Sequence, residues 1–324
     1  MNRILITGGA GFIGSNLIDH FLKQGHKVVC LDNLATGFEH NMQHNYDNPN
    51  FTFIKGDIRD LETCKTAIKS CDYVLHEAAL GSVPRSIKDP ITSNDVNVGG
   101  FLNMLIAARD AGVKRFVYAA SSSTYGDSKK LPKVEDEIGK PLSPYAITKY
   151  VNELYADVFA KTYGMQCIGL RYFNVFGKRQ DPNGAYAAAI PLFVKQLING
   201  EKPTINGDGS ITRDFTYVKN VVKINELAAL AKGSDAVNQV YNVAFGENIN
   251  LNSLFEILIQ QLSRFNKSIS LVKPKYGPER IGDIQDSLAS IEKARNLLGY
   301  KPEYSVRQGL EEAIDWYWEY FNRK

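Results

Sequence analysis

The stretch Ile4-Leu5-Ile6-Thr7-Gly8-Gly9-Ala10-Gly11-Phe12-Ile13-Gly14 decides the fold of this chain. A short apolar run ends in a glycine turn, after which apolar residues recur at helical spacing from Leu17 to Leu22. This pattern predicts a strand, a turn and a helix. Glycines at this spacing let the backbone approach a pyrophosphate at a helix N-terminus. We therefore expect the stretch to open a dinucleotide-binding α/β domain.

Asp32 stands at the end of the second predicted strand, residues 27–31. A carboxylate at this position accepts hydrogen bonds from an adenosine ribose and repels a 2′-phosphate, so NAD is predicted rather than NADP. Asp57 follows the third strand, from where it reaches toward the adenine. Ala78 and Ala79 follow the fourth strand, and their small side chains let a cofactor pass close to the backbone.

Alternating strands and helices continue to about residue 175, which is typical of a Rossmann doubly wound parallel sheet. After Gly177 the alternation loosens. We predict an NAD-binding Rossmann domain at 1–175 and a smaller mixed α/β substrate domain at 176–324, with segments such as 213–232 packing back on the first domain. The expected strands are 4–6, 27–31, 51–54, 73–76, 116–119, 166–170, 239–244 and 270–273, and the expected helices include 60–69, 92–111, 190–198 and 221–231.

The segment Ser143-Pro144-Tyr145-Ala146-Ile147-Thr148-Lys149 begins a further helix, with Ser143 as N-cap and Pro144 at the first helical position. Tyr145 and Lys149 then share one helix face. A tyrosine that acts as a base at neutral pH needs its pKa lowered by about three units from ~10. A neighbouring cation and a helix N-terminus both favour phenolate, so we expect a lowered pKa at Tyr145.

Polar side chains follow two other predicted strands. Ser121, Ser122 and Ser123 come directly after the fifth strand, and the carboxyl end of that strand should face the start of the Tyr145 helix. A hydroxyl group is therefore expected near the phenol. Ser82 and Arg85 belong to the loop after the fourth strand, where open α/β sheets bind ligands. His76, inside that strand, is interpreted as a core histidine.

Composition excludes several classes of protein. The 324 residues carry a net charge of +3, with no dense basic cluster, so no nucleic-acid partner is expected. No apolar run approaches the ~20 residues of a membrane span, and the first strand leaves no room for a signal peptide, so a cytoplasmic location is predicted. The four cysteines lack metal-site spacing and are interpreted as reduced packing residues; no metal is expected.

With these motifs in place, the chain resembles the extended short-chain dehydrogenase/reductase family along nearly its whole length. The likeness is strongest to nucleotide-sugar 4-epimerases that act on UDP-N-acetylglucosamine and UDP-N-acetylgalactosamine. The motifs that carry it are Thr7 to Gly14, Leu80-Gly81-Ser82-Val83-Pro84-Arg85-Ser86, Ser143-Pro144-Tyr145 with Lys149, Leu170-Arg171-Tyr172-Phe173-Asn174, Arg213-Asp214-Phe215 and Arg280-Ile281-Gly282-Asp283.

The resemblance implies a tightly held NAD and a reversible reaction at C4 of the sugar. Tyr145 would take the proton of the 4-hydroxyl while C4 gives up a hydride, and the 4-keto sugar would turn over before the hydride returns. Lys149 would hold the nicotinamide ribose and, together with the positive nicotinamide, lower the pKa of Tyr145. Ser121 matches the family's catalytic serine or threonine, although Ser122 and Ser123 remain alternatives.

The resemblance also assigns binding positions. The cofactor-binding residues would be Gly8, Gly11, Phe12, Ile13, Gly14, Asp32, Asn33, Gly37, Asp57, Ile58, Ala78, Ala79, Asn97, Tyr145, Lys149 and Tyr172. The substrate-binding residues would be Ser82, Arg85, Ser121, Ser122, Ser123, Tyr145, Asn174, Ala188, Arg213, Arg280, Asp283 and Ser287. In galactose-restricted relatives a tyrosine takes the place of Ser287, and the smaller serine leaves room for a 2-acetamido group.

Three alternatives stay open. A nucleotide-sugar 4,6-dehydratase shares the fold but needs an Asp-Glu pair where this chain has Ser122-Ser123, which disfavours it. A UDP-N-acetylhexosaminuronic acid 4-epimerase would pair the sugar carboxylate with Arg85. A non-enzymatic NAD sensor would not need both Tyr145 and Lys149. The family likeness also implies a homodimer formed through helix 92–111 and the Tyr145 helix.

Overall fold

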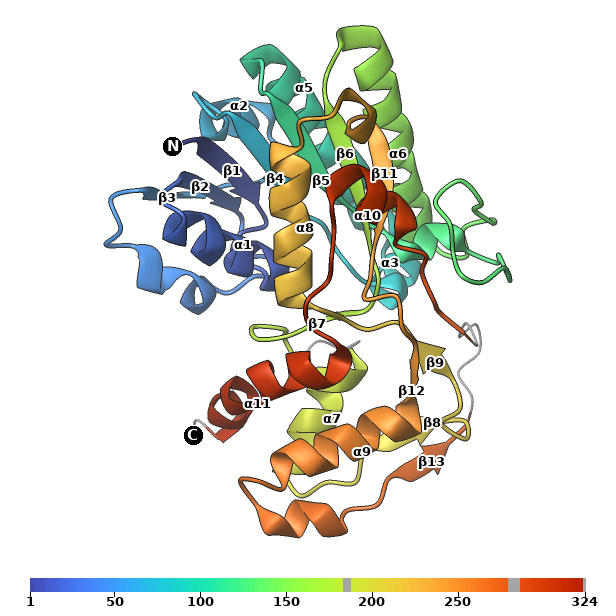
Figure 1. Cartoon of the computed structure of the whole chain (residues 1–324). Coiled ribbons are helices and arrows are strands. Elements are labelled where there is room, and N and C mark those ends of the chain that lie inside the picture. Colours follow the sequence, from blue (N-terminus) through green and yellow to red (C-terminus); the bar gives the residue numbers. More distant parts are fainter. Residues whose placement is uncertain (183–187, 279–285, 323–324) are drawn as a thin grey trace.

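The computed structural model describes residues 1–182, 188–278 and 286–322. Within this part of the chain, a seven-stranded parallel sheet forms the centre of the molecule, in the order β11-β6-β5-β4-β1-β2-β3 (Figure 1). Its strands are β1 (Arg3–Thr7), β2 (Lys27–Asp32), β3 (Phe51–Lys55), β4 (Tyr73–His76), β5 (Arg115–Ser121), β6 (Cys167–Tyr172) and β11 (Gln239–Val243). The sheet confirms the predicted Rossmann fold.

The direction of strand addition reverses at β1. The chain adds β2 and β3 on one side of β1 and then crosses to place β4, β5 and β6 on the other side. In open parallel sheets, ligands bind at the carboxyl ends of the strands that flank such a switch point. The ends of β1 and β4 are therefore where a cofactor is expected.

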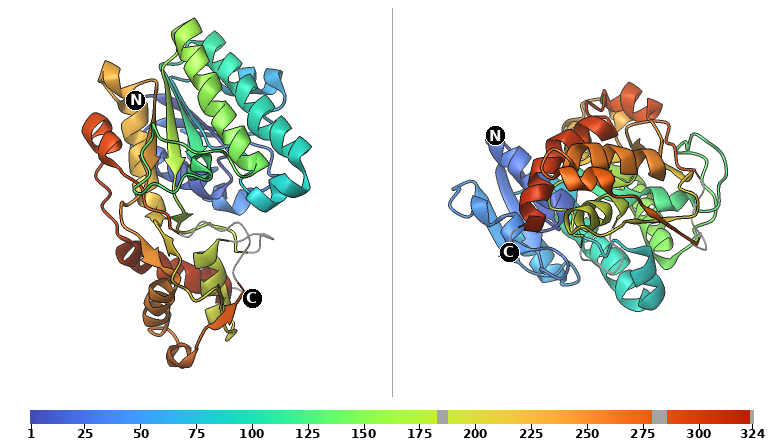
Figure 2. Two further views of the ribbon diagram at one scale, coloured as in Figure 1. Left: turned by 90° about the vertical axis from the view of Figure 1, so that its right-hand side faces the viewer. Right: turned by 90° about the horizontal axis from the view of Figure 1, so that it is seen from below.

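Helices cover both faces of the sheet because its strands are apolar on both sides. Ile4 and Ile6 of β1 face one layer, and Leu5 faces the other. Figure 2 shows the two layers on opposite sides of the sheet. One layer holds α1 (Phe12–Lys23), α8 (Val218–Leu230) and α10 (Glu292–Leu298), and the other holds α2 (Leu61–Ala67), α5 (Phe101–Ala111) and α6 (Pro144–Tyr163).

A smaller part of the molecule lies beyond the carboxyl edge of the sheet, with its own hydrophobic core. Its helices are α7 (Ala189–Ile198), α9 (Leu251–Leu262) and α11 (Val306–Asn322). Its strands are short and pair two by two: β7 (Val175–Phe176) with β10 (Thr216–Tyr217), β8 (Thr204–Asn206) with β13 (Lys275–Gly277), and β9 (Thr212–Arg213) with β12 (Ile249–Asn250).

The remaining elements are short. Two helices, α3 (Val83–Lys88) and α4 (Pro90–Asn94), follow β4. The 3-10 turns are Glu39–Asn41, Gln43–Asn45, Ser122–Tyr125, Ser234–Ala236 and Lys267–Leu271.

The structure corrects one predicted element, a strand, and confirms a long predicted helix. The strand expected at 270–273 is wrong, because Asn266 accepts a hydrogen bond from Ser268 N and turns the backbone into a 3-10 helix; the strand β13 begins at Lys275. The helix expected at 92–111 is confirmed: the backbone is helical from residue 90 to 111, with a π-helical turn at Asp95–Gly100 between α4 and α5.

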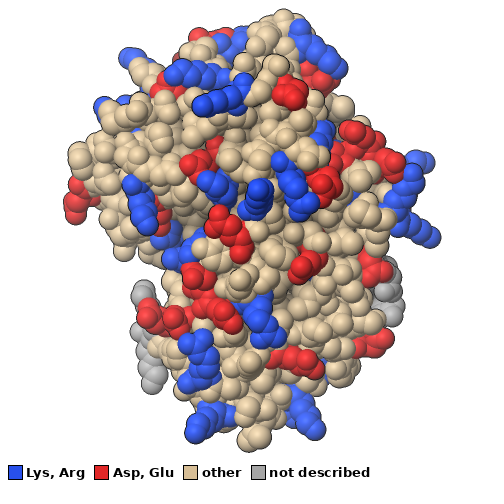
Figure 3. Space-filling model, in the orientation of Figure 1, with Lys and Arg blue, Asp and Glu red and all other residues tan. Residues whose placement is uncertain are grey.

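The expected division between residues 175 and 176 stays a prediction. Segments on its C-terminal side nevertheless join the large sheet, since β11 is its edge strand and α8 packs against β5. The described residues contain no helix long and apolar enough to cross a membrane. Figure 3 shows basic and acidic side chains interspersed over one face of the molecule.

Candidate active site

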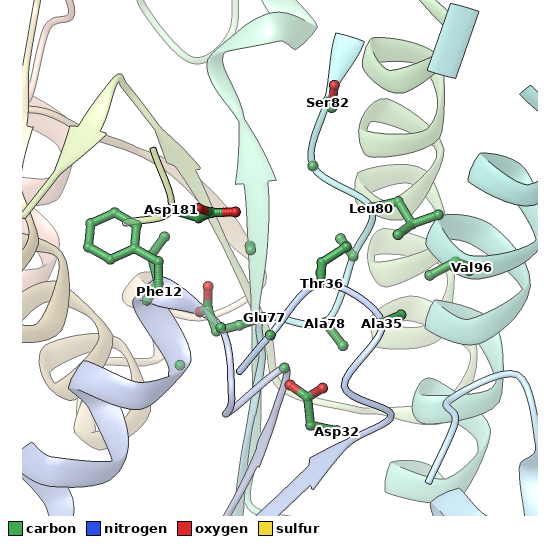
Figure 4. A pocket seen from close by; sticks show the side chains of 18 of the residues that line it. Phe12, Asp32, Ala35, Thr36, Glu77, Ala78, Leu80, Ser82, Val96 and Asp181 are labelled. Carbon is green, nitrogen blue, oxygen red and sulfur yellow. The ribbon is translucent and has the colours of Figure 1, made fainter. Parts of the chain in front are cut away.

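A cavity of about 690 Å³ lies at the carboxyl edge of the sheet, between the sheet and the smaller part. Its walls come from the glycine loop after β1, the ends of β2, β4 and β5, the start of α6 and the loop after β6. Figure 4 shows Asp32, Glu77 and Ala78 along the wall of the cavity. The cavity therefore occupies the switch point of the sheet.

The glycine loop leaves its backbone open toward this cavity. Gly8 has a φ of +69°, and a Cβ there would lie 2.7 Å from the backbone nitrogen of Ala78. A Cβ on Gly14 would collide with the carbonyl of Gly8. Gly11 caps α1 without a side-chain hydrogen bond, so the first amide groups of this helix are available to an anion. The loop fits a dinucleotide pyrophosphate.

The Asp32 carboxylate is fixed at the end of β2. Its two oxygens accept hydrogen bonds from Ala10 N at 3.0 Å and Leu34 N at 2.8 Å. Burial raises the pKa of Asp32, while these two amide donors oppose the rise. Each carboxylate oxygen has more than one lone pair, so the group can still accept a ribose hydroxyl. Its position confirms the predicted strand end.

The Tyr145 helix begins where the sequence predicts. Ser143 Oγ accepts a hydrogen bond from Ala146 N at 3.1 Å, and Pro144 is the first helical residue. Tyr145 N donates to Ser86 Oγ at 3.0 Å, which ties the helix start to α3. The cap and this contact hold Tyr145 at the cavity wall.

The Tyr145 phenol and Ser121, at the end of β5, both line the cavity, and the Ser121 hydroxyl lowers the pKa of the phenol. Ser123 donates to Ser121 Oγ from both its backbone nitrogen, at 3.2 Å, and its hydroxyl, at 2.9 Å. Because Ser121 Oγ accepts these bonds, its own hydrogen is left for the phenol oxygen. Ser122 lines the cavity, whereas Ser123 supports Ser121.

The pKa of Tyr145 differs from the expectation. Burial raises it, the Ser121 hydrogen bond lowers it, and the charge of Glu77 raises it further, so the pKa lies above its ordinary value. Burial also lowers the pKa of Lys149 to about 8, against the opposing effect of Glu77. Lys149 Nζ donates to Ala119 O at 2.8 Å. The chain's own groups thus raise the pKa of Tyr145 overall, and the lowering that the resemblance assigns to Lys149 together with the nicotinamide stays a prediction.

Most of the predicted positions meet in this cavity. The predicted residues that line it are Gly8, Gly11, Phe12, Ile13, Gly14, Asp32, Asn33, Gly37, Asp57, Ile58, Ala78, Ala79, Ser82, Ser121, Ser122, Tyr145, Lys149, Tyr172, Asn174 and Ala188. Asp57 is held by Arg59 and Asn33, and the Arg59 hydrogen bond lowers its pKa to about 2.

Asn97 and Arg85, two of the predicted contacts, do not line the cavity. Asn97 is buried; its side chain accepts a hydrogen bond from Leu80 N at 2.7 Å and donates to Thr148 Oγ1 at 3.2 Å. It therefore joins the loop after β4 to α6. Arg85 lies on α3 and does not line the cavity. His76 is a buried core histidine hydrogen bonded to Thr7 Oγ1 at 2.9 Å, as predicted.

A second cavity of about 250 Å³ continues into the smaller part. It shares Asn174 and Ala188 with the first cavity and is also lined by Arg213 and apolar side chains such as Phe215. Asn174 Nδ2 donates to Asp214 O at 3.1 Å, which links the loop after β6 to the Arg213 segment. Guanidinium and amide donors beside an apolar pocket suit an anionic group joined to a flat ring.

The remaining predicted substrate contacts are less defined. Ser287 N donates to Thr212 O at 3.2 Å, so Ser287 lies beside β9, but it lines neither cavity. Arg280 and Asp283 lie outside the described residues.

The sequence reasoning missed Glu77, which lines the cavity directly after β4. It also missed Arg179 and Asp181, in the loop that follows β7. A carboxylate immediately after a buried parallel strand is a signal that would have identified Glu77.

Comparison with known proteins gives concordant matches. The model of the NAD dependent epimerase/dehydratase family matches residues 4–244. A putative UDP-glucose 4-epimerase of Methanocaldococcus jannaschii is 36% identical, over 97% of this chain and 97% of its own length. The structure of a UDP-N-acetylglucosamine 4-epimerase from Methanobrevibacter ruminantium, in complex with UDP-N-acetylmuramic acid, matches with a TM-score of 0.91 and 39% identity, over 98% of this chain and 99% of that chain.

A third match bears on the cofactor. A UDP-glucuronic acid 4-epimerase from Bacillus cereus, in complex with UDP-glucuronic acid and NAD, matches with a TM-score of 0.87 and 30% identity, over 98% of this chain and 99% of that chain. The glycine cradle and Asp32 of this chain fit the same cofactor, NAD. The family match and the cavity at the switch point agree, and this chain belongs to the NAD dependent epimerase/dehydratase family.

Proposed function

We propose that this chain is a reversible nucleotide-sugar 4-epimerase whose substrates are UDP-N-acetylglucosamine and UDP-N-acetylgalactosamine. The observation that carries the proposal is that Tyr145, Lys149 and Ser121 line the NAD cavity, from which a second cavity lined by Arg213 and Asn174 leads away. A proton acceptor, a cofactor site and a pocket for a nucleotide diphosphate then adjoin one another.

Each residue of the site has its own role in the reaction. Bound NAD supplies a hydride acceptor and donor. Tyr145, as phenolate, accepts the proton of the sugar 4-hydroxyl and returns it to the 4-keto sugar. Ser121 directs its hydroxyl hydrogen to the phenol oxygen and stabilises its negative charge. Lys149, held on Ala119 O, supplies a positive charge and binds the cofactor ribose.

Binding of the substrate is assigned to the second cavity and its rim. Arg213 and Asn174 bind the UDP phosphates, together with Arg280, and the apolar side chains of the second cavity hold the uracil. Turning of the 4-keto sugar requires the UDP to stay bound while the sugar rotates. Two adjoining cavities, one for each half of the substrate, support this division.

The choice of an N-acetylated sugar is supported by the relative from Methanobrevibacter ruminantium and by the family resemblance at Ser287, although Ser287 lines neither cavity. Plain UDP-glucose is the second candidate, and the relative from Methanocaldococcus jannaschii supports it. A uronic acid is less well supported, because Arg85 does not line the cavity. Dehydration is disfavoured since Ser122 and Ser123 supply hydroxyls where that reaction needs carboxyl groups.

A substrate panel tests the proposal. The purified chain, with and without added NAD, is incubated with UDP-N-acetylglucosamine, UDP-glucose or UDP-glucuronic acid, and the products are separated by chromatography. We expect the 4-epimer of the N-acetylated sugar to form fastest. A 4-keto-6-deoxy product would identify a dehydratase, and the absence of any 4-epimer with NAD present would end the epimerase assignment.

We also propose that the chain forms a homodimer through helix 92–111 and α6, with the short helix α3 beside them. Ile147, Leu154 and Val158 form one stripe on α6, and each is about half exposed. Ile87 and Ile91, on α3 and α4, are exposed next to it. We expect Leu154→Glu to produce a monomer in light scattering, and Leu271→Glu, at a more exposed site elsewhere, to leave the dimer intact. A Leu154→Glu dimer would contradict this interface.

A further inference from the structure

Glu77 is a carboxylate in the cofactor cavity that the reaction described above does not use. It follows β4 directly, and its backbone nitrogen donates to Thr7 O at 3.2 Å, which fixes its position in the sheet. Its carboxyl group points into the pocket in Figure 4. Oε1 accepts a hydrogen bond from Tyr172 Oη at 2.8 Å, and Oε2 has no hydrogen-bond partner among the described residues.

The Tyr172 hydroxyl is oriented by a third residue. Asn225 Nδ2 donates to Tyr172 Oη at 2.8 Å and to Val221 O at 2.9 Å, and the second bond fixes which end of the amide faces the tyrosine. Since the amide nitrogen can only donate, the single hydrogen of Tyr172 is committed to Glu77. Hydrogen bonds therefore run from Asn225 to Tyr172 and from Tyr172 to Glu77. Glu77 accepts the last of them, as an ionised carboxylate does, and presents its other oxygen to the cavity.

The charged and titratable groups around Glu77 come from several elements. Lys149 and Tyr145 face it from α6, and Tyr172 from β6. His76, its neighbour on β4, is neutral because burial lowers its pKa to about 3. On the loop after β7, Arg179 and Asp181 also line the cavity; Arg179 is bonded to Asp19 and Ser15 O.

In the chain without a cofactor, opposing effects act on the pKa of Glu77. Burial raises the pKa of Glu77 to about 7, and the Tyr172 hydroxyl and the charge of Lys149 oppose the rise. A positive group that enters the cavity therefore shifts Glu77 to its ionised form.

Asp32 would hold the adenosine of NAD, and the glycine loop would hold the pyrophosphate. The ends of β4, β5 and β6, where Glu77, Ser121 and Tyr172 line the cavity with Tyr145, would then be left for the nicotinamide. Glu77 lies at that end of the cavity.

We propose that Glu77 is the counter-charge of the oxidised nicotinamide, held in place by Tyr172 and Asn225, and that it stabilises bound NAD relative to bound NADH. With Glu77 ionised, two positive charges (Lys149 and the oxidised ring) face two negative ones (Glu77 and the Tyr145 phenolate). A buried site with no net charge avoids an uncompensated desolvation cost.

The site also keeps a net charge of zero after the hydride and the proton have been transferred. Loss of a hydride and a proton from the sugar cancels one positive charge, on the ring, and one negative charge, on Tyr145. Lys149 and Glu77 remain as a neutral pair. Without Glu77 the site would carry one positive charge both before and after the transfer. Glu77 attracts the oxidised ring but repels the Tyr145 phenolate, so its effect on the cofactor is seen most directly when NAD and NADH bind without a sugar.

This inference rests on NAD as the cofactor and not on which sugar is bound, so its test uses the cofactor. The affinities for NAD and NADH are measured by calorimetry on cofactor-free wild-type chain and on Glu77→Gln. We expect Glu77→Gln to bind NAD about tenfold more weakly and NADH nearly unchanged, the effect of one partly screened charge several ångströms away. Equal losses for both cofactors, or no loss for either, would overturn the proposal.

Two further variants separate charge from shape. Glu77→Asp keeps the charge and should keep most of the preference for NAD over NADH. Tyr172→Phe keeps the aromatic ring but removes the hydrogen bond to Glu77, and it should lose part of that preference. Epimerisation by Glu77→Gln with an unchanged preference between NAD and NADH would contradict the proposal and leave the proposed function standing.

Discussion

The two halves of the substrate cleft are built in different ways. In the cofactor half, the reacting groups are fixed by buried contacts at the ends of long parallel strands, such as Ser121 on β5 and Lys149 on Ala119 O. In the sugar half, Arg213 and Ser287 belong to short strand pairs and connecting segments. The difference suggests that proton and hydride transfer depend on a deeply packed frame, while substrate choice depends on residues that can change without disturbing it.

The largest effect on the rate is expected when the phenol oxygen of Tyr145 is removed. Tyr145→Phe keeps the ring and the packing but has no proton acceptor, so we expect the rate of epimerisation to fall by ~10³-fold or more. Bound NAD, measured after denaturation of the protein, should be unchanged. Near-normal turnover would remove Tyr145 from the chemistry.

A smaller loss is expected when the hydroxyl beside the phenol is removed. Ser121→Ala deletes the donor that stabilises the phenolate, and the rate should fall by about 100-fold. Ser123→Ala is the matched control, because Ser123 acts on the phenol only through Ser121, and its loss should be several-fold smaller. A larger effect at Ser123 would reverse the assignment of the catalytic serine.

The sugar half is tested by a substitution that adds bulk. Ser287→Tyr should reduce turnover of UDP-N-acetylglucosamine by at least about tenfold, since the phenol competes for the space of the 2-acetamido group. UDP-glucose should be epimerised at nearly the wild-type rate and serves as the internal control. If both substrates lose rate equally, Ser287 does not select the sugar and the two halves of the cleft are not separable.

The smallest effect is a shift in pH dependence. Burial raises the pKa of Tyr145, and phenolate is the active form, so kcat/KM should rise with pH through that pKa. The charge of Glu77 raises the same pKa, so Glu77→Gln should move the rising limb to lower pH. A limb that stays in place, or moves to higher pH, would show that Glu77 does not act on the phenol.

The cofactor half was also the more predictable half. The glycine loop, the Asp32 strand end and the Ser143 cap are local patterns, and the structure confirms all three. In the chain without a cofactor, burial and Glu77 raise the pKa of Tyr145, which local pattern does not reveal because both effects depend on elements far apart in the chain. Glu77 itself gains its partner from Tyr172, 95 residues later, a contact that periodicity does not reveal.

The sugar half was predicted less well for a related reason. Short strand pairs such as β8 with β13 carry little periodicity, and the strand expected at 270–273 was displaced to Lys275 by the Asn266 turn. The roles of Arg213 and Ser287 came from family resemblance, not from local pattern. Their placement depends on contacts between segments distant in sequence, such as Ser287 with Thr212.

One isotope measurement tests the central claim that a hydride leaves C4 and returns while Tyr145 carries the proton. UDP-N-acetylglucosamine with deuterium at C4 is incubated with the purified chain and NAD in ordinary water, and the 4-epimer is analysed by mass spectrometry and NMR. The account predicts that the product keeps its deuterium at C4. Loss of the label to water would show that C4 is deprotonated instead and would contradict the account.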